Sequence, residues 1–384
     1  MKKIILATDL FRPSPGGIEG FYASLARSWN SEKMRVHITS KGKYSENDFG
    51  PEMQFDEKER YRIVRFPSRK MNLNYFNGKK KFIESVRNEI REFAPDHILI
   101  GNISPQLLLY SRIARSLAVP FSVVINGEDL HALRGMPGYR YKDLFLESRY
   151  LFALSSYIKA KLESGKSFFP PDKIQILPPA VVMPSVFRLK KINLPVDISR
   201  KLKNKTVVLC LGPLVSWKGF DRVIEAAVHL MDLEDKFHIL ITGTGREFQY
   251  IKELIRVKRL EAAVTLTGFL PDYILEEVFR HSHIFFQPHK KAKDAGQGLS
   301  MSLMETAARG IPSVVGRVGG IDELVADGIS GYCVDSEQPV DAALRLRQLI
   351  LSERNRKLMG RNAEKHAREN FKMDNLIRYL DIRL

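Results

Sequence analysis

A glycine-containing loop that runs into a helical pattern, QGLSMSLMETAARGIP, occupies residues 297–312. Gln297 begins the loop, and Glu305 follows eight residues later, about one turn into the expected helix. Backbone amides and one carboxylate therefore converge at this place. A carboxylate can accept two hydrogen bonds from a ribose diol. An ordinary salt bridge is the alternative role of Glu305.

A lysine stands at a second loop-to-helix junction, in GPLVSWKGFDRVIEA, which spans residues 212–226 and follows an apolar strand pattern. From that junction Lys218 can reach a bound ligand. A fixed cation there would stabilise the negative charge that develops on a departing diphosphate, and so lower the barrier. The alternative is a solvated surface lysine.

Two further turns carry closely spaced glycines. Gly16 and Gly17 follow the first expected strand and precede an amphipathic helix, whose free N–H groups favour a phosphate or another anion. A tight turn that needs positive φ is the alternative. Gly243 and Gly245 end the strand pattern ITGTG and are compatible with a nucleotide.

Acidic and imidazole side chains at other strand ends give weaker indications. Glu128 and Asp129 follow Asn126 and could orient a sugar, although acids in turns more often cap helices or form ion pairs. Three histidines flank one buried strand, namely His281, His283 and His289. They lack the carboxylate or cysteine partners of a typical metal site, so we expect structural roles and no metal.

Short β-branched runs that alternate with helical patterns position these loops. In the first half the runs are Lys3–Asp9, Arg35–Ser40, His97–Asn102, Phe121–Gly127 and Tyr150–Ser155. After a stretch punctuated by prolines, they restart as Val207–Gly212, Phe237–Gly243, Val264–Gly268, His283–Pro288 and Pro312–Gly316, and beyond Pro339 the pattern is helical. The fold class is therefore α/β with two doubly wound parallel sheets, and ligands belong at the carboxyl ends of the strands.

In these motifs, the second half resembles the retaining nucleotide-sugar glycosyltransferases of family four, also called glycosyl transferases group 1. Their pattern G-R-L-x-x-x-K-G is similar to residues 212–219, and their pattern E-G-x-x-x-x-x-x-E is similar to residues 297–305. The segment GGIDELVADGISGYCV, residues 319–334, resembles the family's G-G-x-x-E-x-V-x-D-G-x-x-G-x-L-V. The first half resembles the family more loosely, through Gly16-Gly17, NGEDL at 126–130 and ALSSYIKAKL from residue 153.

The resemblance implies a GT-B fold, in which two facing Rossmann-like domains enclose a cleft. Residues 1–185 would bind the acceptor, and a C-terminal helix at about 370–384 would pack back on them. Residues 200–370 would hold the donor, a hexose linked to UDP or GDP. The implied enzyme needs no metal and no cofactor, since the nucleotide diphosphate sugar is a co-substrate. Because no enzymic nucleophile is visible, the implied chemistry is front-face substitution, in which a leaving-group phosphate oxygen takes the acceptor proton.

By this resemblance Lys218 contacts the diphosphate, Glu305 contacts the ribose, and the loop 297–301 surrounds the sugar and phosphate. The implied catalytic residues are Lys218, Gln297, Glu305 and Asn126. The implied donor-binding residues are Gly16, Gly17, Gly212, Ser216, Gly243, Gly245, Phe269, Gly298, Leu299, Ser300 and Met301, and those expected to bind sugar or acceptor are Glu128 and Asp129.

Three positions depart from the family pattern: Gln297 replaces a Glu, Pro213 an Arg and Asn126 a His. Gln297 and Asn126 can still hydrogen-bond sugar hydroxyls. Pro213 offers no charge to a diphosphate, so Arg246 or Lys291 would have to compensate. We expect an active hexosyltransferase. The alternative is a catalytically degenerate scaffold or sensor that binds a sugar nucleotide.

Composition restricts the class of protein. The chain has 384 residues, of which 44% are hydrophobic and 27% charged, as expected for a globular protein with two domains. Two cysteines without framework spacing favour a reducing, cytoplasmic location. Dispersed basic residues without a recognisable module argue against a nucleic-acid partner, and the first turn lacks the dinucleotide fingerprint of an oxidoreductase. A glycoside hydrolase would need a second carboxylate where Gln297 stands.

The charge indicates the acceptor side. Of the net charge of +17, residues 1–190 carry +12, which suits an anionic partner such as acidic lipid headgroups. Residues 69–93 mix basic and aromatic side chains, and they either lie on an anionic membrane or form an ordinary amphipathic helix. We expect a glycan, glycolipid or lipid-linked acceptor, a role in cell-envelope polysaccharide or glycoconjugate synthesis, and peripheral contact with the inner face of the plasma membrane.

Overall fold

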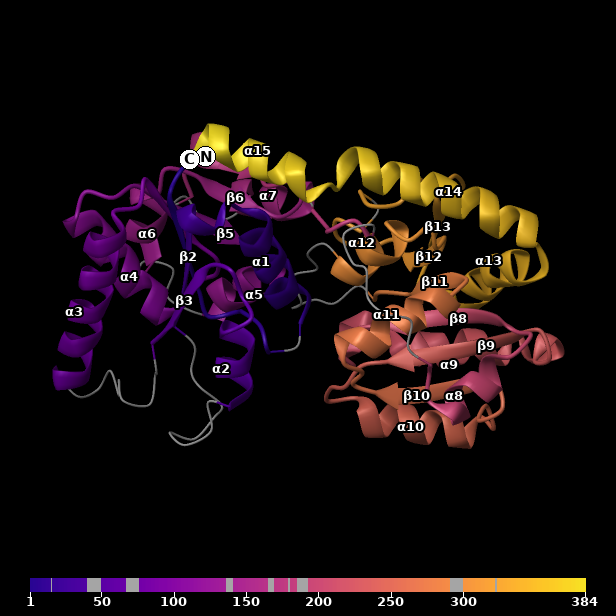
Figure 1. Cartoon of the computed structure of the whole chain (residues 1–384). Helices are drawn as coiled ribbons and strands as arrows, with labels where there is room; N and C mark the ends of the chain where they lie inside the picture. Colours follow the sequence, from indigo (N-terminus) through magenta and orange to yellow (C-terminus); the bar gives the residue numbers. More distant parts are fainter. Residues whose placement is uncertain are drawn as a thin grey trace. The chain divides into compact units, whose positions relative to one another are not determined.

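The chain forms two compact units in a computed structural model. It describes residues 1–14, 16–39, 50–66, 76–135, 141–164, 169–178, 180–184, 193–290, 300–321 and 323–384. Unit 1 comprises Met1–Ala180 together with Met373–Leu384, and unit 2 comprises Val181–Lys372. Each unit is built on its own parallel sheet (Figure 1).

The sheet of unit 1 has seven parallel strands among the described residues, in the order β3-β2-β1-β4-β5-β6-β7. The strands are β1 Ile4–Thr8, β2 Met34–Ile38, β3 Arg62–Arg65, β4 His97–Ile100, β5 Phe121–Ile125, β6 Leu151–Ala153 and β7 Ile174–Ile176. The helices are α1 Gly17–Ser28, α2 Gly50–Asp56, α3 Phe76–Phe93, α4 Pro105–Ser116, α5 Gly127–Gly135, α6 Lys142–Glu147, α7 Ser156–Glu163 and α15 Met373–Arg383. The strand order reverses between β1 and β4, which is the switch point of a doubly wound sheet.

The sheet of unit 2 repeats this order with six parallel strands among the residues described, β10-β9-β8-β11-β12-β13. The strands are β8 Thr206–Leu211, β9 Phe237–Thr242, β10 Val264–Gly268, β11 Ile284–Gln287, β12 Ser313–Gly316 and β13 Gly331–Val334. The helices are α8 Val196–Leu202, α9 Phe220–Val228, α10 Phe248–Val257, α11 Asp272–His281, α12 Met301–Ala307, α13 Pro339–Leu351 and α14 Glu353–Asn370. Here the order reverses between β8 and β11. The two doubly wound sheets confirm the predicted α/β fold class.

Successive side chains of β8 point to opposite faces of the second sheet, and helices cover both faces. Val208 and Cys210 pack with α9, α10 and α13 in one apolar core, while Val207 and Leu209 pack with α8, α11, α12 and α14 in another. All four side chains are buried, as expected for a central parallel strand with helices on both sides. This two-sided core fixes the strand ends from which the candidate site is built.

The C-terminal helix α15 lies beside the N-terminus within unit 1 (Figure 1). The backbone N–H of Lys2 donates to Asp381 Oδ1 at 2.7 Å, and the terminal ammonium lies 3.5 Å from Asp381 Oδ2. Arg149 also donates to the carbonyl oxygen of Leu384 at 3.0 Å. The first β-strand and the last helix are therefore fastened together.

Helix α3 contains most of residues 69–93, which were predicted either to lie on an anionic membrane or to form an ordinary amphipathic helix. Phe82, Val86 and Ile90 follow a helical repeat, and all three are buried in unit 1. Phe82 also meets the ring of Phe66 edge-on at 5.6 Å. The apolar stripe of α3 thus packs in the core, while residues 67–75 lie outside the described residues. No helix in the described part of the chain is both long and apolar enough to cross a membrane.

Gly243 gives a stability prediction. Its φ is 139°, and a Cβ there would overlap the carbonyl oxygen of Gly212 at the end of β8. Gly328 is a matched control, because its φ is 74° but a Cβ would meet nothing within 4 Å. We expect Gly328→Ala to lower the free energy of unfolding by about 1 kcal/mol and Gly243→Ala by at least about 3 kcal/mol. Urea denaturation measures both, and equal losses would contradict the backbone contact.

Candidate functional site

The candidate site of unit 2 starts with the tight packing of two loops at the carboxyl ends of β8 and β9. Gly212 N–H donates to the Thr242 carbonyl at 3.1 Å, and Leu214 N–H donates to the Thr244 carbonyl at 2.9 Å. A Cβ at Gly245 would overlap the carbonyl oxygen of Leu214. Gly243 and Gly245 are therefore needed for loop packing, and their contact with a nucleotide stays a prediction.

Gln287 joins the two strands at the switch point of this sheet. Its side chain is buried, its Nε2 donates to the Leu211 carbonyl at 3.0 Å, and its Oε1 accepts from Ser300 Oγ at 3.2 Å. Ser300 is in turn the N-cap of α12, accepting from Leu303 N–H at 3.4 Å. One amide side chain thus connects the end of β8, the end of β11 and the start of α12. Gln287 is not among the site residues predicted above, although a glutamine inside the apolar run IFFQP was a visible signal.

Lys218 follows β8 in a short 3-10 turn, Ser216–Lys218, and Gly219 then adopts the left-handed conformation with φ 73°. A Cβ at Gly219 would overlap the carbonyl oxygen of Pro288, so this loop packs directly on the residues after β11. The packing brings Lys218 Nζ to 3.3 Å from Nε2 of His289. Lys218 itself is half-buried, whereas Ser216 is exposed.

The protonation of His289 follows from its two contacts. Its Nδ1 lies 3.1 Å from the carbonyl oxygen of Gln287, which can only accept, so Nδ1 carries the proton. Nε2 is then the acceptor for the Lys218 ammonium. Burial, with the positive charge of Lys218 as a second cause, holds the pKa of His289 well below its usual value. His289 is therefore a neutral hydrogen-bond acceptor that holds the Lys218 ammonium in place.

The other two histidines do not join His289. His281 lies 3.5 Å from Glu277, and Nδ1 of His283 accepts from Val207 N–H at the opposite end of β8. Among the residues that the structure describes, no group of three or more His, Cys, Asp or Glu side chains could hold a metal ion.

Glu305 lies one turn into α12, as the sequence predicted, and is half-buried. Arg309 ties this helix to α11, because its Nη1 donates to the Glu305 carbonyl at 2.8 Å and its Nη2 lies 2.5 Å from Glu276 Oε2. Met301, at the first turn, packs partly buried against the core. The expected site residues Gln297, Gly298 and Leu299, and the candidate cation Lys291, lie outside the described residues.

Phe269 directly follows β10, and its side chain is 54% exposed. The preceding Gly268 accepts from Gly243 N–H at 2.9 Å, so Phe269 lies at the same edge of the sheet as the β8 and β9 loops. An exposed aromatic ring there could stack on a base. Arg246, which could compensate for Pro213, is also exposed.

In unit 1, Asn126 and Asp129 form a cap at the start of α5. Asn126 Oδ1 accepts from Glu128 N–H at 2.8 Å and Asp129 N–H at 3.1 Å. Asp129 returns the contact by accepting from Asn126 N–H through Oδ2 and from Ile103 N–H through Oδ1, both at 2.9 Å. Both carboxylate oxygens are thus used within the fold and the side chain is buried, which fits the capping alternative. Direct contact of these residues with sugar stays a prediction.

At the first glycine turn, Gly16-Gly17, the carboxylate of Glu19 occupies the place expected for an anion. A Cβ at Gly16 would overlap the Glu19 carboxylate, which therefore covers the start of α1. Burial and the negative charge of Glu128 raise the pKa of Glu19, although its own backbone N–H and Arg12 oppose the rise. A phosphate at Gly16 and Gly17 would have to displace this carboxylate.

Asp129 predicts a pH dependence of stability. Burial raises its pKa to about 7, with Glu128 and Asp9 adding to the rise against two backbone N–H donors. Between about pH 4 and pH 7 the folded state keeps a proton that the unfolded state has released, so this group lowers the free energy of unfolding as pH rises. In Asp129→Asn that loss is absent. The stability gap between variant and wild type should therefore shift in the variant's favour, by on the order of 1 kcal/mol per pH unit, between pH 5 and pH 7. Urea denaturation at both pH values measures it, and a constant gap would contradict the raised pKa.

His289 predicts a difference between two similar variants. A Gln side chain can still offer an oxygen where Nε2 lies, whereas Asn can replace only Nδ1 and leaves Lys218 without this acceptor. We expect kcat/KM for the donor to fall about tenfold in His289→Asn and to stay within about threefold in His289→Gln. Thermal melts of both variants check the fold. If the two variants lose equally, His289 acts only through packing.

Residues 196–366, which contain Lys218, His289 and Glu305, match the family described as glycosyl transferases group 1. This match covers less than half of the chain, and through these residues the chain is similar to the glycosyl transferases of group 1. The match agrees with the resemblance found in the motifs, and the chain is a glycosyltransferase.

Relatives support the assignment over different lengths of this glycosyltransferase. An uncharacterised glycosyltransferase of Methanocaldococcus jannaschii is 27% identical over 60% of this chain, and the match spans only 56% of that relative. A GDP-mannose-dependent α-(1-6)-phosphatidylinositol monomannoside mannosyltransferase of Mycobacterium tuberculosis is 22% identical over 98% of this chain and 96% of its own length.

Solved structures show the fold. HepE of Anabaena, determined in complex with UDP and glucose, superposes with a TM-score of 0.77 at 17% identity, over 99% of this glycosyltransferase and 98% of that chain. The expected GT-B type of architecture, with two Rossmann-like α/β domains, is thereby confirmed.

Proposed function

We propose that this glycosyltransferase retains the anomeric configuration and transfers a hexose from a UDP- or GDP-linked donor to a glycan, glycolipid or lipid-linked acceptor. The observation that carries the proposal is the Lys218 ammonium, held 3.3 Å from the neutral Nε2 of His289 at the carboxyl end of β8. A cation fixed at the switch point of a doubly wound sheet is placed for a diphosphate.

Glu305 completes the donor site in this proposal. It follows β11, the strand that neighbours β8, and α12 is held in place by the Ser300 cap and by Arg309. A carboxylate there would accept hydrogen bonds from the ribose diol, and the exposed ring of Phe269 would stack on the base. The mycobacterial relative is named for GDP-mannose and HepE was determined with UDP, so both nucleotides remain candidate donors.

The proposed reaction is a front-face substitution. The bond between the anomeric carbon and the diphosphate oxygen breaks while the acceptor oxygen bonds to the same face of that carbon. The acceptor proton passes to a phosphate oxygen of the departing nucleoside diphosphate. Lys218 stabilises the charge that builds up on that leaving group, and it does so more in the transition state than in the bound donor.

The basic charge of residues 1–190 and the phosphatidylinositol mannoside acceptor named for the mycobacterial relative support a lipid-linked or otherwise anionic acceptor. Such an acceptor would place the reaction in the synthesis of cell-envelope polysaccharides or glycoconjugates, at the inner face of the plasma membrane.

Donor turnover tests the proposal. The purified chain is incubated with UDP-glucose and, separately, with GDP-mannose, and proton NMR follows nucleotide release and the anomer of the first sugar product. We expect one donor to be hydrolysed slowly with α-configured sugar appearing first, and Lys218→Ala to abolish the signal. A β-configured first product would contradict retention. Turnover that survives in Lys218→Ala would contradict the assigned site.

A further inference from the structure

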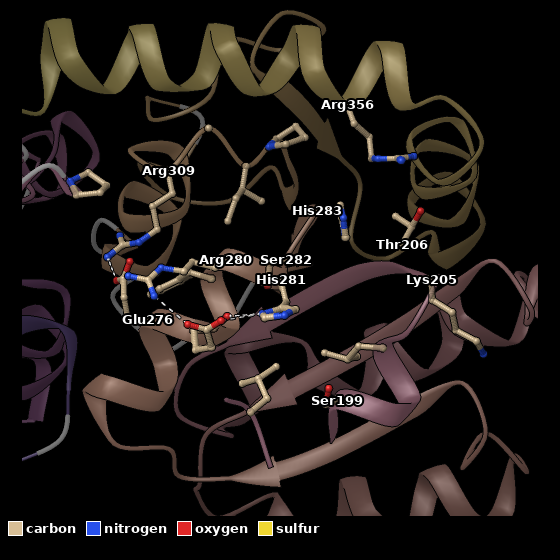
Figure 2. A pocket seen from close by; sticks show the side chains of 18 of the residues that line it. Ser199, Lys205, Thr206, Glu276, Arg280, His281, Ser282, His283, Arg309 and Arg356 are labelled. Atoms are coloured by element: carbon tan, nitrogen blue, oxygen red, sulfur yellow. Dashed lines mark hydrogen bonds and ion pairs between the residues drawn. The ribbon is translucent and has the colours of Figure 1, made fainter. Parts of the chain in front are cut away.

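Unit 2 contains a pocket of about 1580 Å³ that lies away from the proposed donor site. Its lining includes Thr206 at the start of β8, His283 just before β11 and Pro312 just before β12, together with side chains of α8, α11 and α14 (Figure 2). These are the amino ends of the strands, whereas Lys218 and Glu305 follow the carboxyl ends. The pocket therefore belongs to the opposite edge of the sheet.

Positive charge exceeds negative charge in this lining. Eight Lys and Arg side chains and four Glu side chains contribute to it. Each glutamate is already paired with a cation of the same lining: Glu276 with Arg309 at 2.5 Å, Glu277 with Arg280 at 2.9 Å, Glu353 with Lys357 at 2.6 Å and Glu364 with Arg368 at 2.6 Å. Within the described part of the chain, the other four cations form no ion pair with a carboxylate within 4 Å, although Glu353 also attracts the last of them: Arg200, Lys203, Lys205 and Arg356.

Three of these cations lie close together in sequence, at the end of α8 and in the turn after it. Arg200 and Lys203 are exposed, and Lys205 Nζ donates to the Glu234 carbonyl at 2.8 Å. The carboxyl end of a helix offsets about half a positive charge, so α8 leaves most of this charge uncompensated. The basic segment that precedes β8 is thereby part of a pocket wall.

Arg356 extends the positive region away from α8, and the neutral imidazole of His283 belongs to the same lining (Figure 2). Arg356 Nη1 donates to the carbonyls of Leu349 and Ile350 at 2.5 and 2.9 Å, and its Nε and Nη2 find no acceptor among the described residues. His283 Nδ1 accepts from Val207 N–H at 3.0 Å, so Nε2 carries the proton of the neutral ring. Loss of solvation, followed by the positive charges of Arg356 and His281, lowers the pKa of His283, and the negative charge of Glu353 opposes this shift.

We propose that this pocket binds a phosphorylated ligand, with Arg200, Lys203 and Lys205 on one side and Arg356 and His283 on the other. Guanidinium, ammonium and imidazole N–H groups are the donors that phosphate oxygens accept, and phosphate is the multiply charged group that would balance several cations at once. The volume leaves room for an organic group attached to the phosphate. Its phosphate is supplied either by a soluble phosphate ester or by the headgroup of an acidic phospholipid.

NMR of ¹³C-labelled histidine tests the pocket with inorganic pyrophosphate as the probe. Pyrophosphate can also enter the proposed donor site, so the titration is done in Lys218→Ala, where His289 reports on that site and His283 on the pocket. We expect a saturable shift of the His283 resonance and a higher His283 pKa in the presence of pyrophosphate, because a bound anion favours the imidazolium ion. This readout does not depend on the proposed transferase activity.

Two double variants distinguish binding of the anion in the pocket from a general effect of the protein's net charge. The α8 pair, Arg200→Gln with Lys203→Gln, should weaken the His283 response about tenfold. The α10 pair, Lys252→Gln in α10 with Lys258→Gln at its C-terminal cap, removes two exposed charges and should leave the response unchanged. Both pairs remove two charges. Equal weakening by both pairs would overturn the proposal.

Vesicle sedimentation identifies the source of the phosphate. A lipid headgroup would be supported if the protein sediments with phosphatidylglycerol vesicles but not with phosphatidylcholine vesicles. This binding should be lost in the α8 double variant and kept in the α10 double variant. A His283 response to pyrophosphate without such binding would support a soluble phosphate ester. If His283 does not respond and the α8 pair does not change vesicle binding, the pocket binds no phosphate and the proposal is wrong.

Discussion

Lys218→Ala should lower kcat/KM for the donor sugar by about 10²–10³-fold, the loss seen when one group that stabilises transition-state charge is removed. The effect is expected to be this large because Pro213 cannot supply a second charge beside Lys218. Among the described residues, Lys218 is also the cation that His289 orients at the end of β8. Steady-state kinetics with the preferred donor measures the change.

Two controls make the Lys218 result specific. Lys252→Ala removes a charge from the exposed surface of α10 and should leave kcat/KM unchanged. In a double-mutant cycle, His289→Asn should cost little more once Lys218 is Ala, since the histidine acts through the lysine. Additive losses would show that the two residues act separately and would contradict the assigned positioning of Lys218.

Glu305→Ala should weaken binding of the nucleoside diphosphate by about 10²-fold, because the ribose diol loses two hydrogen bonds to a charged acceptor. The half-buried position of Glu305 in α12 limits access of water that could replace those bonds. Calorimetric titration with the preferred nucleoside diphosphate measures the loss in affinity.

The 2′-deoxy form of the same nucleotide is the control for Glu305. Wild type should bind it at least about tenfold more weakly than the ribonucleotide, and Glu305→Ala should bind the two nearly equally. If the variant still prefers the ribonucleotide to the same degree, Glu305 does not contact the ribose and acts within the fold.

Sequence patterns predicted the inner strands and the edge strand β10, and missed the edge strands β3, β7 and β13. The runs that gave β1, β4, β8 and β9 are apolar because these inner strands are buried, and in β8 and β9 helices cover both faces. By contrast, β3 reads RIVR, β7 reads IQI and β13 begins with Gly331, so these short edge strands lack a continuous apolar run. Their pairing depends on a neighbour already in place, which local sequence does not record.

Within the candidate site, the sequence indicated the residues whose charge would contact a ligand directly. Lys218 and Glu305 follow glycine-containing loops, and a cation or a carboxylate at such a place has few roles. Gln287 and His289 were missed because their roles are to connect segments: one joins β8 to α12 and the other holds Lys218 from across the sheet. From the sequence, His289 was considered together with His281 and His283 as metal ligands. The contact of His289 with Lys218 was therefore not predicted.

In unit 1 the carboxylates take part in the fold more than the sequence indicated. Asp129 caps the turn after β5 and Glu19 covers the glycine turn after β1. Their types were visible in the sequence, but which of several nearby N–H groups they bind is decided by how β1, β4 and β5 lie side by side. Acceptor recognition in this unit therefore remains a prediction based on charge and relatives.

The most direct test of the donor site is calorimetric titration of the purified chain with UDP, GDP, ADP and CMP, followed by the best binder on Lys218→Ala and Glu305→Ala. We predict tight binding of UDP or GDP, with CMP the weakest because it lacks the second phosphate, and a large loss of affinity in both variants. Binding of none of the four nucleotides, or equal binding by wild type and both variants, would contradict the assignment of the nucleotide-sugar site to the strand ends of unit 2.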